Sequence, residues 1–375
     1  MVKRRILHVV YSLDPGGMEN GVVNVANSLD KDRFEIFILC LSQSGELSKR
    51  LNSDIKVIEL NKRSGFDLLI IPQIYRLMAD FRPDIVHSHN LGPLIYVILP
   101  VISTNLSVQL IQGEHASLTD ADLTSRKIVQ RMLLYPFCTV LHTVGREMTR
   151  HFSDLFFTNS KFCTLQNGVD TERFLPTLDQ ENYTVSPTLK NKFVISLFAR
   201  FGKYKGHAYV LDLFEKIASD YPDTILMFVG GGGENESLVL SLVEEHPYKD
   251  RIICTGFQQD PVPFYQVSDI VVLASENEGL SNVMLEAMSC SVPVVAMKSC
   301  GVSDLIVDGE NGFIVPDESM RSALLILTTL LGQRAELLVG IGRNARAFIE
   351  VNYSIRSMIK SYDECYIGYS APVGL

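Results

Sequence analysis

Two glutamates frame a short polar motif in the second half of the chain. Residues 278–286 read Glu-Gly-Leu-Ser-Asn-Val-Met-Leu-Glu. A carboxylate accepts hydrogen bonds from two neighbouring hydroxyl groups at once, and charge-assisted bonds of this kind are about twice as strong as neutral ones. We therefore predict that Glu278 and Glu286 bind the hydroxyl groups of a sugar and of a ribose.

The elements around this motif place both carboxylates at one edge of a sheet. The apolar segment 269–273 is predicted to be a strand, and Ser281 or Asn282 is predicted to be the N-cap of the following helix. Glu278 then lies in the loop at the carboxyl end of the strand, where ligands bind in open α/β sheets. Free N–H groups between the glutamates favour a phosphate, and they belong to Gly279, Leu280, Ser281 and Asn282.

A second loop supplies positive charge. The buried-strand segment 193–199 ends in Arg200, and Lys205 precedes the predicted helix 208–218. A pyrophosphate leaving group gains negative charge when its bond to a sugar breaks, and an arginine with a lysine at a helix N-terminus stabilises that charge without a metal. Arg200 and Lys205 are therefore the predicted diphosphate-binding pair.

Further short motifs extend this pattern over nearly the whole chain. Their order and spacing resemble the retaining glycosyltransferases of family GT4. The resemblance implies a nucleotide-diphosphate sugar donor, an acceptor hydroxyl, retention of anomeric configuration, no divalent metal and no cofactor. In chain order the motifs are Gly16-Gly17-Met18-Glu19, His89, Glu114-His115, Asn167-Gly168-Val169-Asp170, Arg200 with Lys205-Gly206, 230–233, Thr255-Gly256-Phe257 and 278–286.

The resemblance also implies the α/β GT-B fold, in which two Rossmann-like, doubly wound parallel-sheet domains face each other across a cleft. Apolar strand segments that alternate with helix-period segments favour the same architecture. With a linker predicted at 177–188, the first, acceptor-side domain is 1–176 plus a C-terminal helix at about 356–375, and the nucleotide-sugar domain is 177–355. The predicted strands are 6–11, 35–39, 55–59, 84–88, 108–112, 139–144, 193–198, 224–229, 251–254, 269–273 and 292–296.

Four glycines are predicted to let the backbone approach the donor. Gly16 and Gly17 follow the first predicted strand and carry no side chain that would hold a ligand away. The run 230–233 lacks the spacing of a dinucleotide fingerprint and the lysine of a P-loop. Gly230 and Gly232 are therefore predicted to form a turn under a base or ribose.

Histidines and aspartates of the first half are further candidates. His115 follows the strand 108–112, and the resemblance implies that it hydrogen-bonds the transferred sugar. His87-Ser88-His89 places two imidazoles on one face of a strand, but no third metal ligand is evident, so His89 is interpreted as lining of the cleft. Asp120-Ala121-Asp122 has metal-binding spacing, yet it precedes a helix, where acids stabilise the N-terminus. We therefore expect no metal site.

Composition limits the function and the compartment. A chain of 375 residues is long enough for two domains, and a net charge of −9 argues against nucleic-acid binding. The seven cysteines form no Cys-x-x-Cys pair, which favours a reducing compartment. The longest apolar segment, 93–102, is about half the length that crosses a bilayer. We expect a cytoplasmic protein that neither spans a membrane nor is exported.

One basic segment bears on membranes. Arg126, Lys127 and Arg131, followed by Arg146 and Arg150, are interleaved with apolar residues. A helix of this kind either faces solvent or docks on anionic lipid, and docking would suit a lipid-linked acceptor at the inner face of the membrane.

Two other functions remain open for this architecture. A sugar-nucleotide 2-epimerase would need acid and base carboxylates on the first-domain side and no acceptor. A non-catalytic binding module would need no catalytic set, and the presence of Arg200, Lys205, Glu278 and Glu286 argues against it. Ala199 and the segment 300–304 depart from the family pattern, so base, sugar and acceptor stay open.

Overall fold

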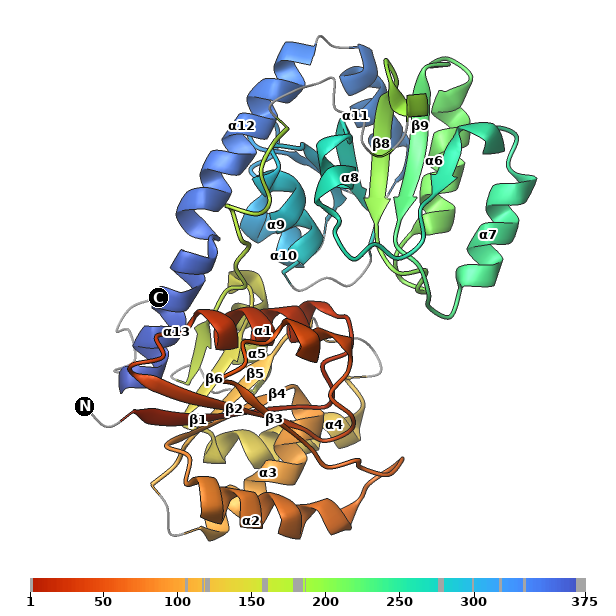
Figure 1. Ribbon diagram of the computed structural model, residues 1–375. Coiled ribbons are helices and arrows are strands. Elements are labelled where there is room, and N and C mark those ends of the chain that lie inside the picture. Colours follow the sequence, from red (N-terminus) through yellow and green to blue (C-terminus); the bar gives the residue numbers. More distant parts are fainter. Residues whose placement is uncertain are drawn as a thin grey trace. The chain divides into compact units, whose positions relative to one another are not determined.

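A computed structural model describes residues 3–104, 107–116, 118, 122–156, 161–177, 185, 187–275, 280–298, 300–316, 319–332 and 335–368. The chain divides into two compact units. The first unit holds the chain up to Gly168 together with the chain from Ile355 on, and the second unit is Val169–Ser354. Each unit is built around its own parallel sheet (Figure 1).

The sheet of the first unit has seven strands in the order β3-β2-β1-β4-β5-β6-β7, all paired in parallel. The connections leave β1 in one direction along the sheet and return beyond it to β4, so the topological switch lies between these two strands. The strands are β1 (Arg4–Val10), β2 (Phe34–Cys40), β3 (Lys56–Glu59), β4 (Ile85–His89), β5 (Gln109–Glu114), β6 (Val140–Thr143) and β7 (Phe162–Thr164).

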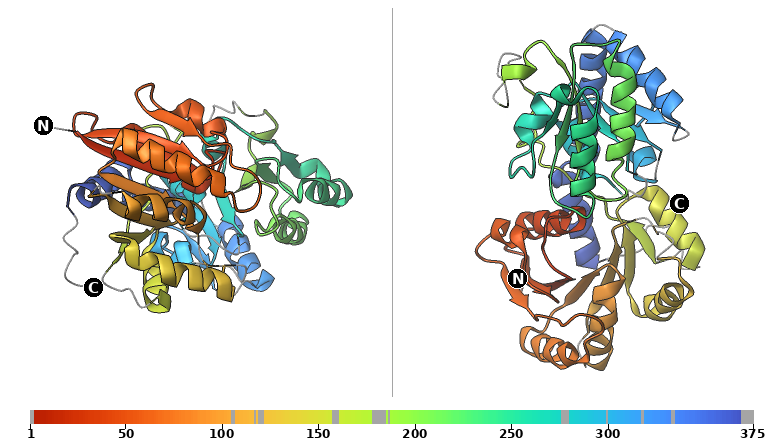
Figure 2. Two further views of the ribbon diagram at one scale, coloured as in Figure 1. Left: turned by 90° about the horizontal axis from the view of Figure 1, so that it is seen from below. Right: turned by 90° about the vertical axis from the view of Figure 1, so that its right-hand side faces the viewer.

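Helices cover both faces of this sheet (Figure 2). The face that carries Ile6, Ile85 and Ile111 shares one apolar core with Val22 of α1 and Tyr362 of α13, so these two helices cover it. The longer helices of the unit are α1 (Gly17–Ser28), α2 (Ile71–Phe81), α3 (Leu91–Ser103), α4 (Ser125–Leu134), α5 (Arg146–Phe156) and α13 (Ile355–Gly368).

The second unit repeats the pattern with six parallel strands in the order β10-β9-β8-β11-β12-β13. Its switch point lies between β8 and β11. The strands are β8 (Phe193–Phe198), β9 (Thr224–Val229), β10 (Ile252–Cys254), β11 (Ile270–Leu273), β12 (Val294–Met297) and β13 (Phe313–Val315). The helices are α6 (His207–Ala218), α7 (Glu236–Glu245), α8 (Val262–Gln266), α9 (Asn282–Ser289), α10 (Cys300–Leu305), α11 (Met320–Gly332) and α12 (Ala335–Asn352).

This architecture confirms the predicted pair of Rossmann-like parallel-sheet units. All eleven predicted strands overlap an observed one, and β7 and β13, of three residues each, were not predicted. The second unit begins at Val169, earlier than the predicted linker, because the intervening segment packs on it. The carbonyl of Phe174 accepts hydrogen bonds from Ser289 Oγ at 2.8 Å and from Arg346 Nη1 at 3.0 Å.

Within the described residues, no single helix has the length and apolar composition needed to cross a bilayer. Only α11 and α12 taken together pass that criterion, and the two are bent by 113° at the break between them.

Candidate active-site loops of the two units

The strand order brings the predicted site residues of each unit to neighbouring strand ends. In the second unit, Arg200 follows β8 and Ser275 follows β11, the two strands that flank the switch point. In the first unit, Gly16 follows β1 and Asn90 follows β4, which flank the corresponding point. Ligands of open α/β sheets bind outside the carboxyl ends of the strands at such points.

The loop that carries Arg200 and Lys205 is a tight turn between β8 and α6. Arg200 is exposed and Lys205 is half-buried. Gly206, the N-cap of α6, has φ 73°, and a Cβ there would clash with the backbone of Ala274. A glycine is therefore required where the loop passes the end of β11.

The glycine turn after β9 is joined to this loop by backbone hydrogen bonds. The carbonyl of Gly232 accepts from Phe201 N at 2.8 Å, and the carbonyl of Phe201 accepts from Asn235 N at 2.9 Å. Gly230 and Gly232 have φ of 143° and 70°, values that side chains rarely permit. The structure thus brings the predicted turn at Gly230 and Gly232 beside the Arg200 loop.

Helix α9 begins at Asn282 with Ser281 as its N-cap. Leu280 and Ser281 are buried, Asn282 and Glu286 are half-buried, and both Glu278 and Gly279 lie outside the described residues. The structure therefore locates only the later part of the predicted 278–286 motif.

Glu286 has a partner that the sequence did not reveal. Its Oε2 accepts a hydrogen bond from the hydroxyl of Tyr265 at 2.8 Å. Tyr265 is 1% exposed, and its ring stacks on Phe198 at 3.9 Å between centroids. Burial, and secondarily the Glu286 charge, raise the pKa of Tyr265, so the phenol keeps its proton and donates a hydrogen bond. Tyr265 thereby fixes the Glu286 carboxylate.

Gly16 and Gly17 form the start of α1. Gly16 is its N-cap in extended conformation, which any residue can adopt, and Gly17 is its first residue. A Cβ on Gly16 would clash with the carboxylate of Glu19. The flexible end of the Glu19 side chain can move away, so neither this contact nor the backbone conformation requires glycine at residue 16.

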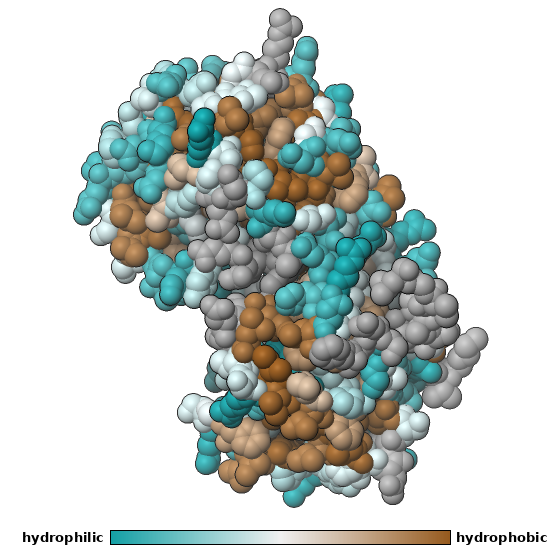
Figure 3. All heavy atoms as spheres, turned by 180° about the vertical axis from the view of Figure 1, so that it is seen from behind, coloured by the Kyte–Doolittle hydropathy of each residue, from teal (hydrophilic) through white to brown (hydrophobic). Residues whose placement is uncertain are grey.

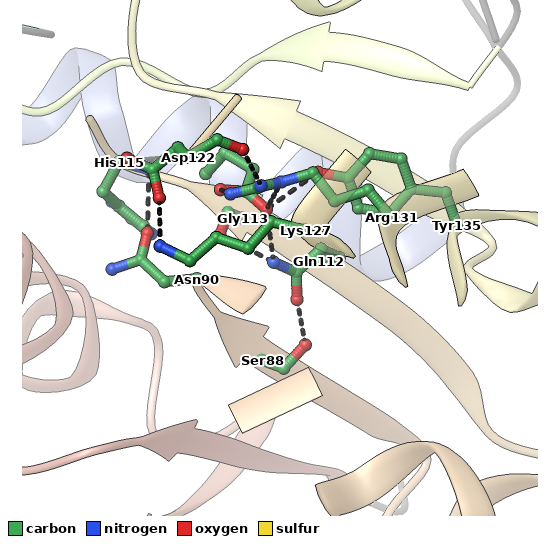
Figure 4. Close-up of polar contacts among 10 residues, drawn as sticks. Ser88, Asn90, Gln112, Gly113, His115, Asp122, Lys127, Arg131 and Tyr135 are labelled. Atoms are coloured by element: carbon green, nitrogen blue, oxygen red, sulfur yellow. Dashed lines mark hydrogen bonds and ion pairs between the residues drawn. The ribbon is translucent and has the colours of Figure 1, made fainter. Parts of the chain in front are cut away.

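His115 lies just beyond β5 in a loop that is tied to its neighbour. Asn90, with φ 66°, donates from its backbone N to the carbonyl of Gly113 at 2.7 Å. Its side-chain Oδ1 accepts from His115 N at 3.2 Å (Figure 4). The two loops at the switch point of the first unit are thus held together.

Glu114 lies on the face of the sheet that is opposite to α1 and α13, and there it anchors α4. Its Oε2 pairs with Arg131 Nη2 at 3.3 Å, and its Oε1 accepts from the Tyr135 hydroxyl at 2.8 Å and from Gln112 Nε2 at 3.3 Å (Figure 4). Arg131 is 3% exposed. The interpretation of Arg131 as a surface basic residue is therefore wrong, because its charge is taken up by a buried carboxylate.

Five histidines gather on the face that α13 covers. Parallel register sets His8 opposite His87, His89 opposite Gly113, and Gly113 opposite His142. Alternate residues of a strand point to one face, which adds His115 to the group. A Cβ on Gly113 would lie 2.5 Å from His142 Nε2 and 2.8 Å from His115 Nε2, so only glycine leaves room for these rings.

Hydrogen bonds divide the five rings into two chains. In the first, His115 Nε2 lies 2.9 Å from His89 Nδ1, and His89 Nε2 lies 3.0 Å from His8 Nδ1. In the second, His142 Nε2 lies 2.8 Å from His87 Nε2, whose ring bonds the Tyr366 hydroxyl through Nδ1 at 2.7 Å. His89 is thus 1% exposed inside the unit.

These rings are neutral at pH 7. Burial lowers the pKa of His8 to about 3 and that of His142 to about 4, and His142 adds to the effect on His8. Burial also holds the pKa of His87, His89 and His115 well below the ordinary value. A neutral imidazole offers one N–H donor and one acceptor, which is what a chain of N···N hydrogen bonds needs.

The structure adds a third histidine to the His87 and His89 pair that the sequence presented. One nitrogen from each of His8, His87 and His89 lies within 4.8 Å of the others. Nitrogen ligands around tetrahedral zinc are about 3.4 Å apart. The His87 and His89 rings, however, are stacked 4.2 Å apart at 27°, so their in-plane lone pairs run side by side instead of converging. The arrangement fits hydrogen bonding better than metal ligation.

The other candidate for a metal, the acidic pair, is half described. Asp122 Oδ1 pairs with Lys127 Nζ at 2.9 Å, and Asp120 lies outside the described residues. The lysine already neutralises the Asp122 charge.

Comparison with protein families gives two matches that adjoin along the chain. Residues 15–173 match the model of Glycosyltransferase Family 4, and residues 179–348 match that of Glycosyl transferases group 1.

Relatives that match this chain over nearly their whole length are also named as glycosyltransferases. An uncharacterized glycosyltransferase of Haemophilus influenzae is 26% identical over 354 residues, covering 92% of this chain and 95% of the relative. An Escherichia coli UDP-Gal:alpha-D-GlcNAc-diphosphoundecaprenol alpha-1,3-galactosyltransferase is 23% identical and covers 97% of both chains. Among solved structures, Anabaena HepE in complex with UDP and glucose has a TM-score of 0.84 at 18% identity, covering 97% of this chain and 99% of that one.

Proposed function

This chain belongs to the glycosyltransferases that join a family 4 domain to a group 1 domain and use nucleotide-sugar donors, and we propose that it transfers the sugar with retention and without a metal. Its acceptor is the hydroxyl of a glycan, of a lipid-linked saccharide or of a small molecule. The observation that carries the proposal is the connected set of loops in the second unit, where Arg200, Lys205 and the Gly230–Gly232 turn adjoin at one sheet edge.

The proposed roles follow the charges. Arg200 and Lys205 stabilise the negative charge that develops on the departing diphosphate. Glu286 binds the ribose hydroxyls, with its orientation set by Tyr265. Glu278 binds the transferred sugar together with backbone N–H groups at the start of α9, and His115 hydrogen-bonds the same sugar. We infer front-face departure and attack, because none of these side chains is an obvious nucleophile.

Metal independence is part of the proposal. Arg200 and Lys205 are proposed to neutralise the diphosphate charge, which a divalent metal does in other enzymes. The Asp122 carboxylate, a candidate metal ligand, is paired with Lys127. Turnover is expected to persist in excess EDTA. Complete loss of turnover on chelation, restored by Mg²⁺ or Mn²⁺, would refute this part.

The donor is best identified by binding and then by turnover. The names of the relatives make uridine diphosphate sugars the first to test. A ligand at 100 times its dissociation constant stabilises the folded protein by about 2.7 kcal/mol, so a thermal-shift panel of nucleoside diphosphates and their sugars identifies the base. The anomeric proton of the product, followed by NMR, then reports retention; an inverted product contradicts the proposal, and an altered nucleotide sugar formed without acceptor indicates an epimerase.

A lipid-linked acceptor is supported by the surface of α4. Arg131 is the buried residue of this helix, whereas Val129, Met132 and Leu133 are 50%, 55% and 65% exposed. The neighbouring α3 has no charged residue and exposes Leu99 and Ile102 at its end. Apolar residues gather on one face of the first unit in Figure 3. α4 also exposes Arg126 and contains no acidic residue, so we propose peripheral contact with anionic lipid at the inner face of the membrane.

Vesicle flotation tests this contact. The protein is expected to float with vesicles that contain anionic lipid and to remain in solution with neutral ones. Met132→Ser with Leu133→Ser should abolish flotation, while Leu325→Ser, which changes an apolar residue of the second unit that is 68% exposed, should not. Equal flotation of all variants would contradict docking through α4.

A further inference from the structure

One of the two histidine chains ends at a predicted sugar-binding residue. It runs from His115 through His89 to His8 by N···N contacts of 2.9 and 3.0 Å. Its two terminal nitrogens, His115 Nδ1 and His8 Nε2, are buried and have no partner among the described residues. Most buried polar atoms have a hydrogen-bond partner, so each one without a partner calls for an explanation.

The number of protons on the three rings restricts the tautomers that they can adopt. Each N···N hydrogen bond holds one proton, and each neutral imidazole carries one proton on one of its two nitrogens. Only two arrangements keep both hydrogen bonds. In the first, all three rings are protonated on Nε2 and His115 Nδ1 is an acceptor. In the second, all three are protonated on Nδ1 and His115 Nδ1 is a donor.

Mixed arrangements break the chain. If His89 and His115 differed in tautomer, two N–H groups or two lone pairs would face each other at 2.9 Å. At an N···N separation of 2.9 Å, no water fits between the two nitrogens to relieve that conflict. Any other arrangement that kept both hydrogen bonds would need a charged His89 ring, and burial, which lowers the pKa of His8 and His89, disfavours the cation.

We propose that His89 and His8 are positioning residues that set the tautomer of His115, so that the three rings change tautomer together and fix whether His115 Nδ1 accepts or donates. The functional part of this inference rests on the proposed binding of the sugar by His115. Sugar binding through His115 Nδ1 requires this buried nitrogen to become accessible, and a sugar hydroxyl that then donates to it selects the arrangement with all protons on Nε2. His8, inside the sheet, then contributes to sugar binding without touching the sugar.

Nitrogen NMR of the full chain, labelled with ¹⁵N-histidine at pH 7, tests the coupling without any substrate. The chain has eight histidines, and single substitutions assign their signals. We expect His8, His89 and His115 to be neutral and to share one tautomer. A different tautomer in any one of the three, or an imidazolium signal from any of them, would overturn the proposal.

A pair of substitutions separates coupling from packing. His8→Phe keeps a ring in place but removes the end of the chain, and should change the tautomer ratio of His115. His142→Phe makes the same change in the neighbouring chain, which shares no N···N bond with the first, and should leave the His115 tautomer ratio unchanged. An unchanged ratio in His8→Phe sinks the proposal, and His8→Gln serves as the second variant if the phenylalanine variant does not fold.

Kinetics then test the link to the sugar. His8→Phe is expected to raise the donor KM about tenfold, with a smaller effect on the affinity for the bare nucleoside diphosphate. Coupled tautomers with an unchanged donor KM would refute the role in sugar binding. Absence of any sugar transfer would instead refute the proposed function and leave the tautomer measurement standing.

Discussion

In the second unit, the residue that is proposed to bind the ribose differs from the residues that are proposed to stabilise the transition state. Arg200 and Lys205 lie on the loop after β8, whereas Glu286 lies inside α9 and is held by Tyr265. Groups that face developing charge contribute mainly in the transition state, and groups that face an unchanging ribose contribute equally before and during reaction. Their substitutions should therefore affect different kinetic constants.

Arg200→Met and Lys205→Met should each lower kcat, because both cations are proposed to face the departing diphosphate. Loss of one such donor typically costs about 10² to 10³ in rate. Steady-state kinetics with saturating donor measure the effect, and Lys203→Met, an exposed cation of the same loop, is the control. Unchanged kcat in both variants would show that the phosphates bind elsewhere.

Glu286→Gln should raise the donor KM with a smaller effect on kcat, since it removes uniform binding. Tyr265→Phe should do the same more weakly, because it removes only the hydroxyl that orients the carboxylate at 2.8 Å. Glu278→Gln should instead depress kcat. If Glu278→Gln weakened the bare nucleoside diphosphate and Glu286→Gln did not, the roles of the two glutamates would be reversed.

At the scale of elements, α4 is attached to its sheet by charge. The Glu114 and Arg131 side chains are 5% and 4% exposed, and α4 turns its apolar residues outward around them. Glu114 directly precedes His115, so the ion pair between Glu114 and Arg131 also stabilises the end of β5, next to the residue that is predicted to bind the sugar. The position of this helix depends on one buried ion pair.

Arg131→Met should destabilise the first unit by about 3 to 5 kcal/mol, because it leaves the Glu114 carboxylate buried and unpaired. Adding Glu114→Gln should recover part of that loss. Lys49→Met breaks an exposed pair with Glu46 in the same unit and should cost no more than about 1 kcal/mol. Urea unfolding followed by circular dichroism measures all three, and equal effects of Arg131→Met and Lys49→Met would contradict a buried anchor.

Sequence patterns predicted the elements better than the contacts between them. Strands such as β8 and β9 are continuous apolar runs, which periodicity identifies directly. The edge strands β7 and β13 are too short to carry such a signal. Arg131 looked like a surface residue because its partner lies on another element, and Tyr265 gave no sign that it would reach Glu286.

The histidine chains show the same limit. The His87 and His89 pair was visible in the sequence, but its partner His8 comes from β1, 79 residues before His87, and Gly113 makes the room. Strand register, which the sequence did not specify, brings these rings together.

At the scale of the whole molecule, the two units carry different sets of buried titratable groups. The first holds five histidines with lowered pKa values. In the second, burial and then Lys205 lower the pKa of His207 to about 4, while burial raises the pKa of Asp269 to about 6. These groups have opposite signs of linkage to folding.

The first unit should therefore unfold before the second as the pH falls from 7 to 5. A histidine whose pKa is 6.5 when unfolded and about 4 when folded gives its full contribution above pH 6.5 and loses about 2 kcal/mol of it by pH 5. Asp269 acts in the other direction, because its folded pKa lies above its unfolded one and protonation below pH 6 favours the folded state. In the second unit this gain offsets part of the loss at His207.

Hydrogen exchange followed by mass spectrometry, corrected for the intrinsic pH dependence of exchange, reports the two units separately. Protection in β1, β4 and β5 should fall between pH 7 and pH 5 while protection in β8 and β9 is retained, and His142→Phe should restore part of it. Simultaneous loss in both sheets would show that the buried histidines do not control acid stability.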